Sequence, residues 1–436
     1  MRRHRIHPAG KNRGRQKPRP NNEEGVIIIL VAIFLLFVVG AMAALSIDIT
    51  TFYTARSEAQ LAADGAALAA ARVLANSGMT SDPNAASDNL LTNAAALAKN
   101  VALQVAQQNQ IGGGAATSIT VSDPFNCGLA PSIQTNPCVK VTVTRSDLPT
   151  FFARIWGSKQ ITVSASATAE AYNPSGLAGT AASPAAPVAP TCVKPWLLPN
   201  QAATGGPTIF TLATGQAASG LLGTPVSPLI VDCGGNGDCN GSLQSAVLWR
   251  YYPGSSDSFP PPAASSVACS GTPYQLSIAG CVQTPIACNA SVNLDLSDYP
   301  GRDSETFSAV NCLTHSTADA GDKIDQTTFP AGPFEFLTGA DNPVVQAGAI
   351  KSGTDVLVSD SLVTVPVYGS ITATNSANIV GFVQLFLDSN GTAAPNGGGG
   401  IDSVIVNLVG CSAGVTGTPV YGNGPSAVAV RLLTPP

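Results

Sequence analysis

One run of 23 residues without a charged side chain lies between Glu24 and Asp48. This run, GVIIILVAIFLLFVVGAMAALSI (25–47), would extend about 34 Å as an α-helix, enough for a bilayer core of about 30 Å. We therefore expect residues 25–47 to form a transmembrane helix, with the lipid bilayer as its first partner.

Charge is distributed very unequally on the two sides of this run. Residues 1–20 contain eight Lys and Arg and no acid, whereas residues 48–436 contain 13 Lys and Arg against 24 Asp and Glu. The positive-inside rule then predicts a basic cytoplasmic arm over 1–24 and an extracytoplasmic location for the rest. The acidic balance of the outer part argues against nucleic acid as a partner.

A cleaved signal peptide is the alternative, because Ala41-Met42-Ala43 fits a cleavage site. The apolar run is long for such a peptide, and its helical pattern continues to Asn76 without a proline. We expect an uncleaved anchor in which 25–76 form one helix, about 78 Å long. Its outer half presents a face of small residues expected to pack against other elements: Ala59, Ala63, Ala66 and Ala70.

A spaced motif follows the apolar run, Gln60-Leu-Ala-Ala-Asp64-Gly-Ala-Ala-Leu68. With Gly25 before the run and Asp48 at its outer edge, it resembles the N-terminal membrane domain of TadG-like (TadE/TadG-like) Flp pilus assembly proteins. Gly65 stands where that family has alanine. The positions that match the family motif are Gly25, Asp48, Gln60, Asp64 and Leu68.

The resemblance implies a non-enzymatic role in Tad/Flp pilus assembly or anchoring, with other pilus-assembly proteins as partners. It also implies a single-pass protein of the bacterial inner membrane, with the bulk of the chain in the periplasm. A pilin is not expected, because the fifth residue after Gly25 is Leu30 and not the Glu of prepilins. Alternatives are a surface adhesin or glycan-binding envelope protein and an envelope hydrolase.

Larger TadG-like proteins carry a von Willebrand A domain with a metal-binding D-x-S-x-S motif. That string does not occur here, and Asp295-Leu-Ser-Asp298 lacks the final serine. We therefore expect no metal at such a site and no cofactor.

The fold class expected is α+β: the transmembrane helix and its stalk continuation, a small α+β domain (48–172), and a β-rich domain (191–436). Asp82-Pro83 predicts the start of a second helix, which the Gly-rich stretch at 112–114 would end. Leu90, Leu97 and Val101 would face the stalk helix. Alternation predicts strands at 118–122, 139–144 and 160–171. Between the last two, an aromatic turn at 149–157 is expected to belong to the core.

Residues 173–190, rich in Pro and Ala, are expected to form an extended linker. Four strands are predicted beyond it, at 362–368, 379–387, 401–409 and 427–433. Pro366 would confine the first of them to a sheet edge or a bulge.

The ten cysteines all lie at or beyond position 127, and none belongs to a C-x-x-C pair. An even number outside the membrane favours disulfides over zinc. A bond between Cys127 and Cys138 would close a short loop. The candidates are Cys127, Cys138, Cys192, Cys233, Cys239, Cys269, Cys281, Cys288, Cys312 and Cys411.

Little in the outer part suggests catalysis. His315, near Asp319, is expected to be solvated, and Cys312 beside it to form a disulfide. The acid pairs Asp303/Glu305 and Asp322/Asp325 would serve glycoside hydrolysis only if they faced each other across a cleft. A calcium loop at 232–241 offers only two carboxylates, and a disulfide-closed turn is favoured there.

Overall fold

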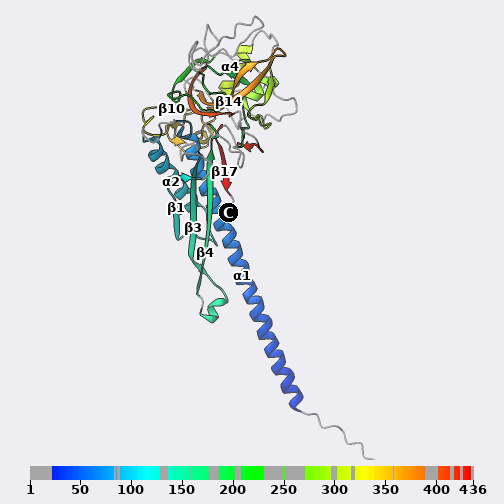
Figure 1. The fold of residues 1–436 in the computed structure, drawn as a ribbon. Helices are drawn as coiled ribbons and strands as arrows, with labels where there is room; N and C mark the ends of the chain where they lie inside the picture. Colours follow the sequence, from blue (N-terminus) through cyan, green and yellow to red (C-terminus); the bar gives the residue numbers. More distant parts are fainter. Residues whose placement is uncertain are drawn as a thin grey trace, which may run out of the picture.

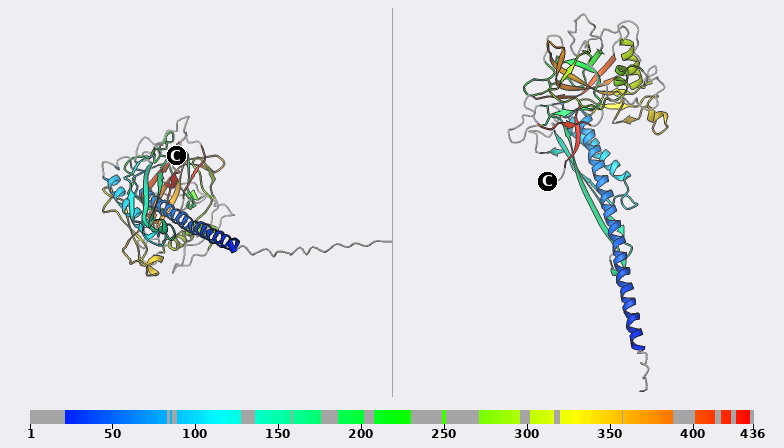
Figure 2. Two further views of the ribbon diagram at one scale, coloured as in Figure 1. Left: turned by 90° about the horizontal axis from the view of Figure 1, so that it is seen from below. Right: turned by 90° about the vertical axis from the view of Figure 1, so that its right-hand side faces the viewer.

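The structure is a computed structural model that describes most of the chain. The described residues are 22–82, 85, 89–127, 136–157, 159–175, 186–201, 208–229, 249–250, 271–295, 302–315, 320–356, 358–387, 401–412, 417–422 and 426–433. The basic arm before residue 22, Cys233, Cys239, Cys269 and the proposed calcium loop lie outside them. A long stalk carries a rounded head at one end, as Figure 1 and the right view of Figure 2 show.

Helix α1 (Asn22–Asn76) is continuous over 55 residues, so the predicted single helix across Asp48 is confirmed. Its apolar lower part is exposed, and its most apolar window contains no buried residue. By length and composition this helix could cross a membrane. The upper half packs against α2, β3 and β4.

Helix α2 (Leu90–Gln108) begins later than Asp82-Pro83 predicted. Asn89 precedes it in the left-handed region, at φ 66°, and makes no side-chain cap. Asp82 instead accepts a turn hydrogen bond from the N–H of Ala85. The preceding residue, Ser81, donates to the carbonyl of Leu408 in strand β15 (Ile401–Gly410) of the head. The chain is therefore held at the head at the point where the helix was predicted to begin.

The stalk sheet is antiparallel and has the strand order β1-β3-β4-β17, with β2 also paired to β3. Its strands are β1 (Ser118–Val121), β2 (Phe125–Asn126), β3 (Pro137–Pro149), β4 (Gln160–Tyr172) and β17 (Ala429–Leu433). The strands predicted within 118–171 are therefore present. Small side chains on the inner face of β4 let the sheet lie close to α1: Ala165, Ala167, Ala169 and Ala171.

The last strand does not belong to the head, where residues 191–436 were expected to fold together. β17 pairs with β4 from Ala429↔Tyr172 to Leu433↔Thr168. Ala427, Val428 and Ala429 are buried in the same core as the alanines of α1. The chain thus leaves the stalk after β4, passes through the head, and returns as β17 to the edge of the stalk sheet beside β4.

The head contains a seven-stranded sheet with the order β7-β15-β14-β13-β6-β8, to which β9 adds by pairing with β14. Its strands are β6 (Trp196–Pro199), β7 (Pro225–Leu229), β8 (Trp249–Arg250), β9 (Ser291–Asn293), β13 (Leu362–Ile371), β14 (Ser376–Leu387) and β15 (Ile401–Gly410). The three strand predictions within 362–409 are confirmed, because long apolar runs form the buried centre of the sheet.

Pro366 lies within β13, an inner strand, so the sheet edge, one of the two predicted alternatives, is wrong. The other alternative, a bulge, is closer, because the register with β14 shifts between Val367 and Tyr368. On the β6 side, however, pairing is interrupted between the bridge Val193↔Thr364 and the pair Leu198↔Val367. Pro366 occupies this interruption, where a missing N–H costs no ladder hydrogen bond.

Shorter elements complete the structure. Two small sheets are formed by β10 (Lys323–Asp325), β11 (Glu335–Leu337) and β12 (Asp355–Val356), and by β5 (Val188–Ala189) with β16 (Val420–Tyr421). The expected linker is thus packed at its end, at buried Val188 and Ala189. The remaining helices are η1 (Ala153–Trp156), α3 (Pro273–Ala279), α4 (Arg302–Leu313) and α5 (Pro343–Gln346).

Disulfides join segments of the head that are distant in sequence. The predicted bond Cys127–Cys138 is present in the stalk domain. Cys192 is bonded to Cys281, and Cys288 to Cys411, across separations of 89 and 123 residues. Cys312 is also disulfide-bonded, as predicted, and no free cysteine occurs among the described residues.

Candidate functional site

Asp48, the first charged residue after the apolar run, forms a junction between α1 and the β3–β4 hairpin. Its carboxylate accepts hydrogen bonds from the backbone N–H groups of Phe151 (2.9 Å), Phe152 (3.0 Å) and Ala153 (2.7 Å). These groups open the short helix η1, so the carboxylate takes the place of an N-terminal cap. The far end of the hairpin is thereby held beside the outer end of the apolar segment (Figure 1).

The charge of Asp48 is stabilised by this arrangement. Burial acts to raise the pKa of its carboxyl group, but the three backbone donors outweigh burial and hold the pKa below its usual value. The group is therefore ionised at neutral pH and remains a strong acceptor for the hairpin.

The other motif positions lie along α1. Gln60 donates to Asp64 Oδ1 (2.7 Å) and to the carbonyl of Ser166 on β4 (3.3 Å), which ties the helix to the sheet. Leu68 packs at the margin of the stalk core, and Gly25 lies near the beginning of α1. The motif residues thus follow one helix rather than meeting in a pocket.

The small face of α1 is fully buried, as predicted. Ala59, Ala63, Ala66 and Ala70 have no exposed surface. Of the three larger side chains of α2 expected to fill the groove, Leu90 is fully buried in this core, whereas Leu97 and Val101 pack against it only partly buried. Most of the buried face of α2 consists of alanines at intervals of four: Ala94, Ala98, Ala102 and Ala106. Close backbone approach therefore forms this contact.

The first aromatic side chain of the turn at 149–157 does not lie in the core, contrary to expectation, and the side chains of Ile155 and Trp156 are outside what the structure describes. Phe151 is 61% exposed, and Phe152 is partly buried. The turn is too far from the head and from α2 to be covered by them, because β3 and β4 extend beyond the end of the packed stalk (Figures 1 and 2).

The upper end of the stalk is joined to the head by a buried polar network. Asn173 Nδ2 donates to the carbonyls of Thr80 (3.1 Å) and Leu408 (3.0 Å). Asn407 Nδ2 donates to the carbonyl of Ala75 at the end of α1 (2.9 Å), and the Leu408 N–H donates to Ser81 Oγ (2.9 Å). Since buried polar groups are costly when unpaired, this network fixes one orientation of the head on α1.

The C-terminal strand is held to β4 by a buried charge. Arg431 Nε donates to Glu170 Oε2 at 2.7 Å, and Glu170 has no exposed surface. The guanidinium also lies 4.7 Å from the ring centre of Tyr172. Burial raises the pKa of Glu170 despite the Arg431 charge, and burial likewise raises the pKa of Tyr172 to about 12.

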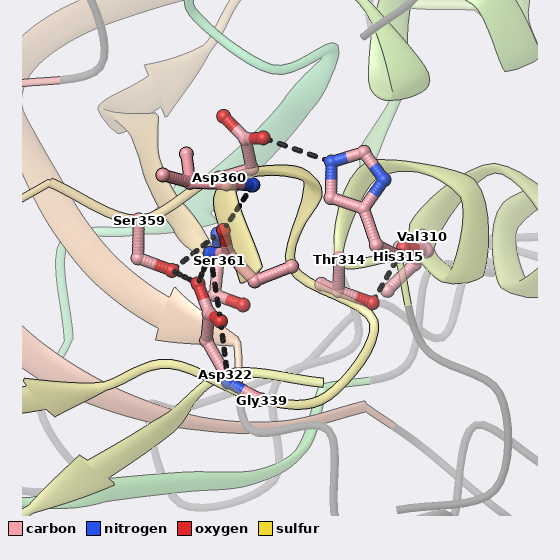
Figure 3. A network of polar contacts seen from close by, with 10 residues as sticks. Val310, Thr314, His315, Asp322, Gly339, Ser359, Asp360 and Ser361 are labelled. Carbon is pink, nitrogen blue, oxygen red and sulfur yellow. Dashed lines mark hydrogen bonds and ion pairs between the residues drawn. The ribbon is translucent and has the colours of Figure 1, made fainter. Parts of the chain in front are cut away.

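In the head, His315 is buried, at 3% exposure, and not solvated as predicted. Its Nε2 lies 2.9 Å from Asp360 Oδ2, as Figure 3 shows. Its other ring nitrogen has no hydrogen-bond partner among the described residues. Asp319, the acid near His315 in the sequence, lies outside the described residues.

Asp322 and Asp325 do not form a pair of carboxylates that face each other across a cleft. Asp322 is buried and accepts from Ser359 Oγ (2.6 Å), the Gly339 N–H (2.9 Å) and Asn342 Nδ2, in the lower part of Figure 3. Asp325 accepts from the Thr327 N–H. Within the described ranges, no three His, Cys, Asp or Glu residues gather as a metal site would require. The side chain of Asp303 is not described.

Lys194 is a buried cation near the same region of the head. Its ammonium donates to the carbonyls of Ile278 (2.6 Å) and Gly280 (2.7 Å). Burial lowers the pKa of Lys194 to about 7, while the Asp360 charge acts in the opposite direction. Both carbonyl bonds serve to hold strand β6 beside α3.

Sequence reasoning did not identify Glu170, Arg431, Asn173 or Asn407. A signal existed for the first two, because each is the only charged residue in an otherwise uncharged strand. Alternation places Glu170 on the outer face of β4 with Ser166 and Thr168, and its pairing with Arg431 of the returning C-terminal strand cannot be predicted from β4 alone.

Comparisons with known proteins match the N-terminal third of the chain. Residues 25–73 match a family described as Flp pilus-assembly TadE/G-like, and residues 54–169 match one described as Tad-like Flp pilus-assembly. The first match ends within α1 and the second ends within β4, so together they cover the apolar segment and most of the stalk domain. No curated protein and no solved structure matches the chain.

Proposed function

We propose that this chain, whose N-terminal region is TadE/G-like, is a non-enzymatic, membrane-anchored component of Tad/Flp pilus assembly or anchoring. The single observation that carries the proposal is the continuity of α1, which runs without a break from the exposed apolar segment into the packed stalk. A helix that spans a bilayer and continues outside it holds the head at a fixed distance from the membrane.

The location follows from the same helix. The proposed orientation has the basic arm in the cytoplasm and the stalk and head in the periplasm, with α1 crossing the inner membrane once, and the charge asymmetry supports it. Disulfide-bonded cysteines in the stalk and head agree with an oxidising compartment. Protease added to spheroplasts should therefore digest the head and leave the arm protected.

The partners proposed are other pilus-assembly proteins, bound without catalysis. The two family matches are the basis for this proposal, and they cover the stalk but not the head. Binding to the assembly machinery is therefore assigned to the stalk region rather than to the head.

Deletion of the gene in its own bacterium is the test. Loss of assembled Flp pili, restored by the full chain, supports the proposal. Normal pili combined with lost surface attachment would contradict it and favour the adhesin. A stalk-only variant must keep residues 426–433, because β17 completes the stalk sheet; removal of the head in this form should preserve assembly.

A further inference from the structure

We propose that the turn joining β3 to β4, residues 149–160, is a second membrane contact that rests in the interface of the bilayer. We call this turn the hairpin tip. The inference rests on the proposed membrane-spanning role of α1, and it adds a lipid-binding site that lies on a different part of the chain.

The first argument is the position of the hairpin tip. Three backbone groups of the tip, at residues 151–153, bond to the carboxylate of Asp48. Asp48 is the first charged residue after the apolar run, so it marks where α1 leaves the hydrocarbon. Figure 1 shows the tip beside α1 at this level, pointing toward the exposed apolar half of the helix. The tip is therefore placed at the depth of the lipid headgroups.

The second argument is the chemistry of the exposed side chains. Phe151 is 61% exposed on the tip, and Tyr53 is 65% exposed one turn beyond Asp48 on α1. Tyr and Trp are enriched at this depth of a membrane because their apolar rings carry a polar group. Phe is common on the apolar face of segments that lie in the interface. The two rings come from different elements and are largely exposed, although the Tyr53 ring has an edge contact with Phe52, and this exposure matches a bilayer interface.

The third argument is charge. Arg154 and Lys159 are exposed on the tip. Two acids beside the tip are already engaged: Asp48 bonds to the tip backbone, and Asp147, just before the tip in sequence, pairs with Arg145 Nε at 3.0 Å. A net positive, aromatic tip suits a surface of anionic lipids, which attracts exposed Lys and Arg within a Debye length. The occupant proposed is thus the lipid bilayer and not a protein groove.

A second contact would change what the anchor does. A single transmembrane helix leaves the stalk free to rotate and tilt, whereas a helix and a tip at one depth restrict both motions. The polar network between Asn173, Asn407 and the end of α1 passes this restriction to the head. The tip would therefore set the direction in which the head faces.

The experiment uses the full chain reconstituted in phosphatidylcholine/phosphatidylglycerol vesicles, with bromines near the top of the acyl chains as quenchers. Tryptophan is introduced by Phe151→Trp in a Trp156→Phe background. Trp196 and Trp249 remain in every variant, so the emission of the Trp156→Phe chain itself is subtracted as the blank. Leu36→Trp, in the apolar segment, is the positive control. Tyr421→Trp, an exposed aromatic site on the head, is the negative control. Flotation with the vesicles reports the anchor independently of the tip.

We expect the tryptophan at position 151 to emit at shorter wavelength than the one at 421 and to be quenched by at least about twofold more. Quenching should persist when protein is diluted with lipid, and it should weaken when Arg154 and Lys159 are both changed to Gln. Floating protein with equal quenching at 151 and 421 overturns the tip contact and leaves the anchor intact. Quenching lost on dilution indicates a second copy and also overturns it. Protein that does not float refutes both proposals.

Discussion

Glu170 and Arg431 are 261 residues apart in sequence, yet the Arg431 Nε lies 2.7 Å from the Glu170 Oε2. The pair closes the stalk sheet after the chain has passed through the whole head. Folding of the stalk therefore depends on the last strand, and the stalk sheet is completed only once the C-terminal residues are in place.

Replacing Arg431 by Met should leave the buried Glu170 carboxylate without its cation. A fully buried pair broken in this way costs about 3–5 kcal/mol, and because Arg431 is one-third exposed we expect about 2–3 kcal/mol. Thermal unfolding of the full chain in detergent measures the loss. Adding Glu170→Gln should recover most of it, and a double variant no more stable than Arg431→Met would contradict the pairing.

The same variant should show a pH dependence of definite sign. Burial raises the native pKa of Glu170 above its unfolded value, so the native state binds the proton more tightly. Stability must then fall as pH rises from the unfolded pKa toward the native one. Arg431→Met raises the native pKa further, so its deficit should be larger at about pH 8 than at about pH 5. An equal deficit at both pH values would be inconsistent with a buried, titrating carboxylate.

Changing Asp48 to Asn should release the hairpin tip while leaving the fold intact. One amide oxygen cannot accept three backbone hydrogen bonds with the strength of a carboxylate. Trypsin should cut faster after the exposed Arg154, whereas Asp64→Asn, elsewhere on α1, should leave the rate unchanged. In the native protein, the pKa of Asp48 is lowered. The contact between its carboxylate and the hairpin tip is therefore fully present above the usual pKa of Asp, and it is lost only as pH falls through the lowered pKa. Unchanged cleavage in Asp48→Asn would exclude this role.

Enlarging the buried small face of α1 should destabilise the stalk. Ala63→Leu and Ala66→Leu should each cost about 1–3 kcal/mol, because both side chains have no exposed surface. Arg56→Leu and Ser57→Leu, on the exposed side, are matched controls. Gln60 is unsuitable as a control because it bonds to Asp64 and β4. Equal melting temperatures for the buried-face variants and the exposed-side controls would mean that this face is not packed in solution.

Changing Gly65 to Ala should stabilise the protein. A methyl group there would meet Val105 Cγ1 at 3.9 Å, an ordinary contact, and glycine in a helix interior is worse than alanine by about 0.8–1 kcal/mol. Gly112→Ala is the opposing control, because its φ is +55° and a methyl group would lie 2.3 Å from Leu148 Cδ1. Unfolding in denaturant should rank Gly65→Ala above and Gly112→Ala below the native chain. The reverse order would contradict the ordinary contact described at Gly65 and the close contact described at Gly112.

Lys194 predicts a second pH dependence, in the head. Its native pKa of about 7 lies far below the unfolded value of about 10.4, so between these values the unfolded state binds the extra proton. Stability should therefore rise between about pH 7 and about pH 9, and Lys194→Met should remove that rise. Exposed Lys351→Met is the control and should keep the slope. If stability still rises with pH in Lys194→Met, the rise must come from other titrating groups.

Several features are determined by local sequence alone. The apolar run, the absence of proline to Asn76 and the regular spacing of alanines were enough to predict α1 and its buried face. Runs such as 379–387 and 401–409 were enough to predict the central strands of the head. In α1 the helical spacing of the alanines decides both the conformation and the side that is buried. In the head, the continuous apolar runs predict strands that are buried on both faces.

Tertiary structure alone decided which segments meet. Asp48 bonds to backbone groups about 100 residues later, which carry no mark of their own in the sequence. Cys288 pairs with Cys411 rather than with its neighbour Cys281. Strand 429–433 has the same alternation whether it pairs in the head or in the stalk, and the choice depends on the edge of β4 that the folded head brings within reach. Partner choice is a property of the folded chain, because hydrogen bonds and close packing require positions in space that distant segments define together.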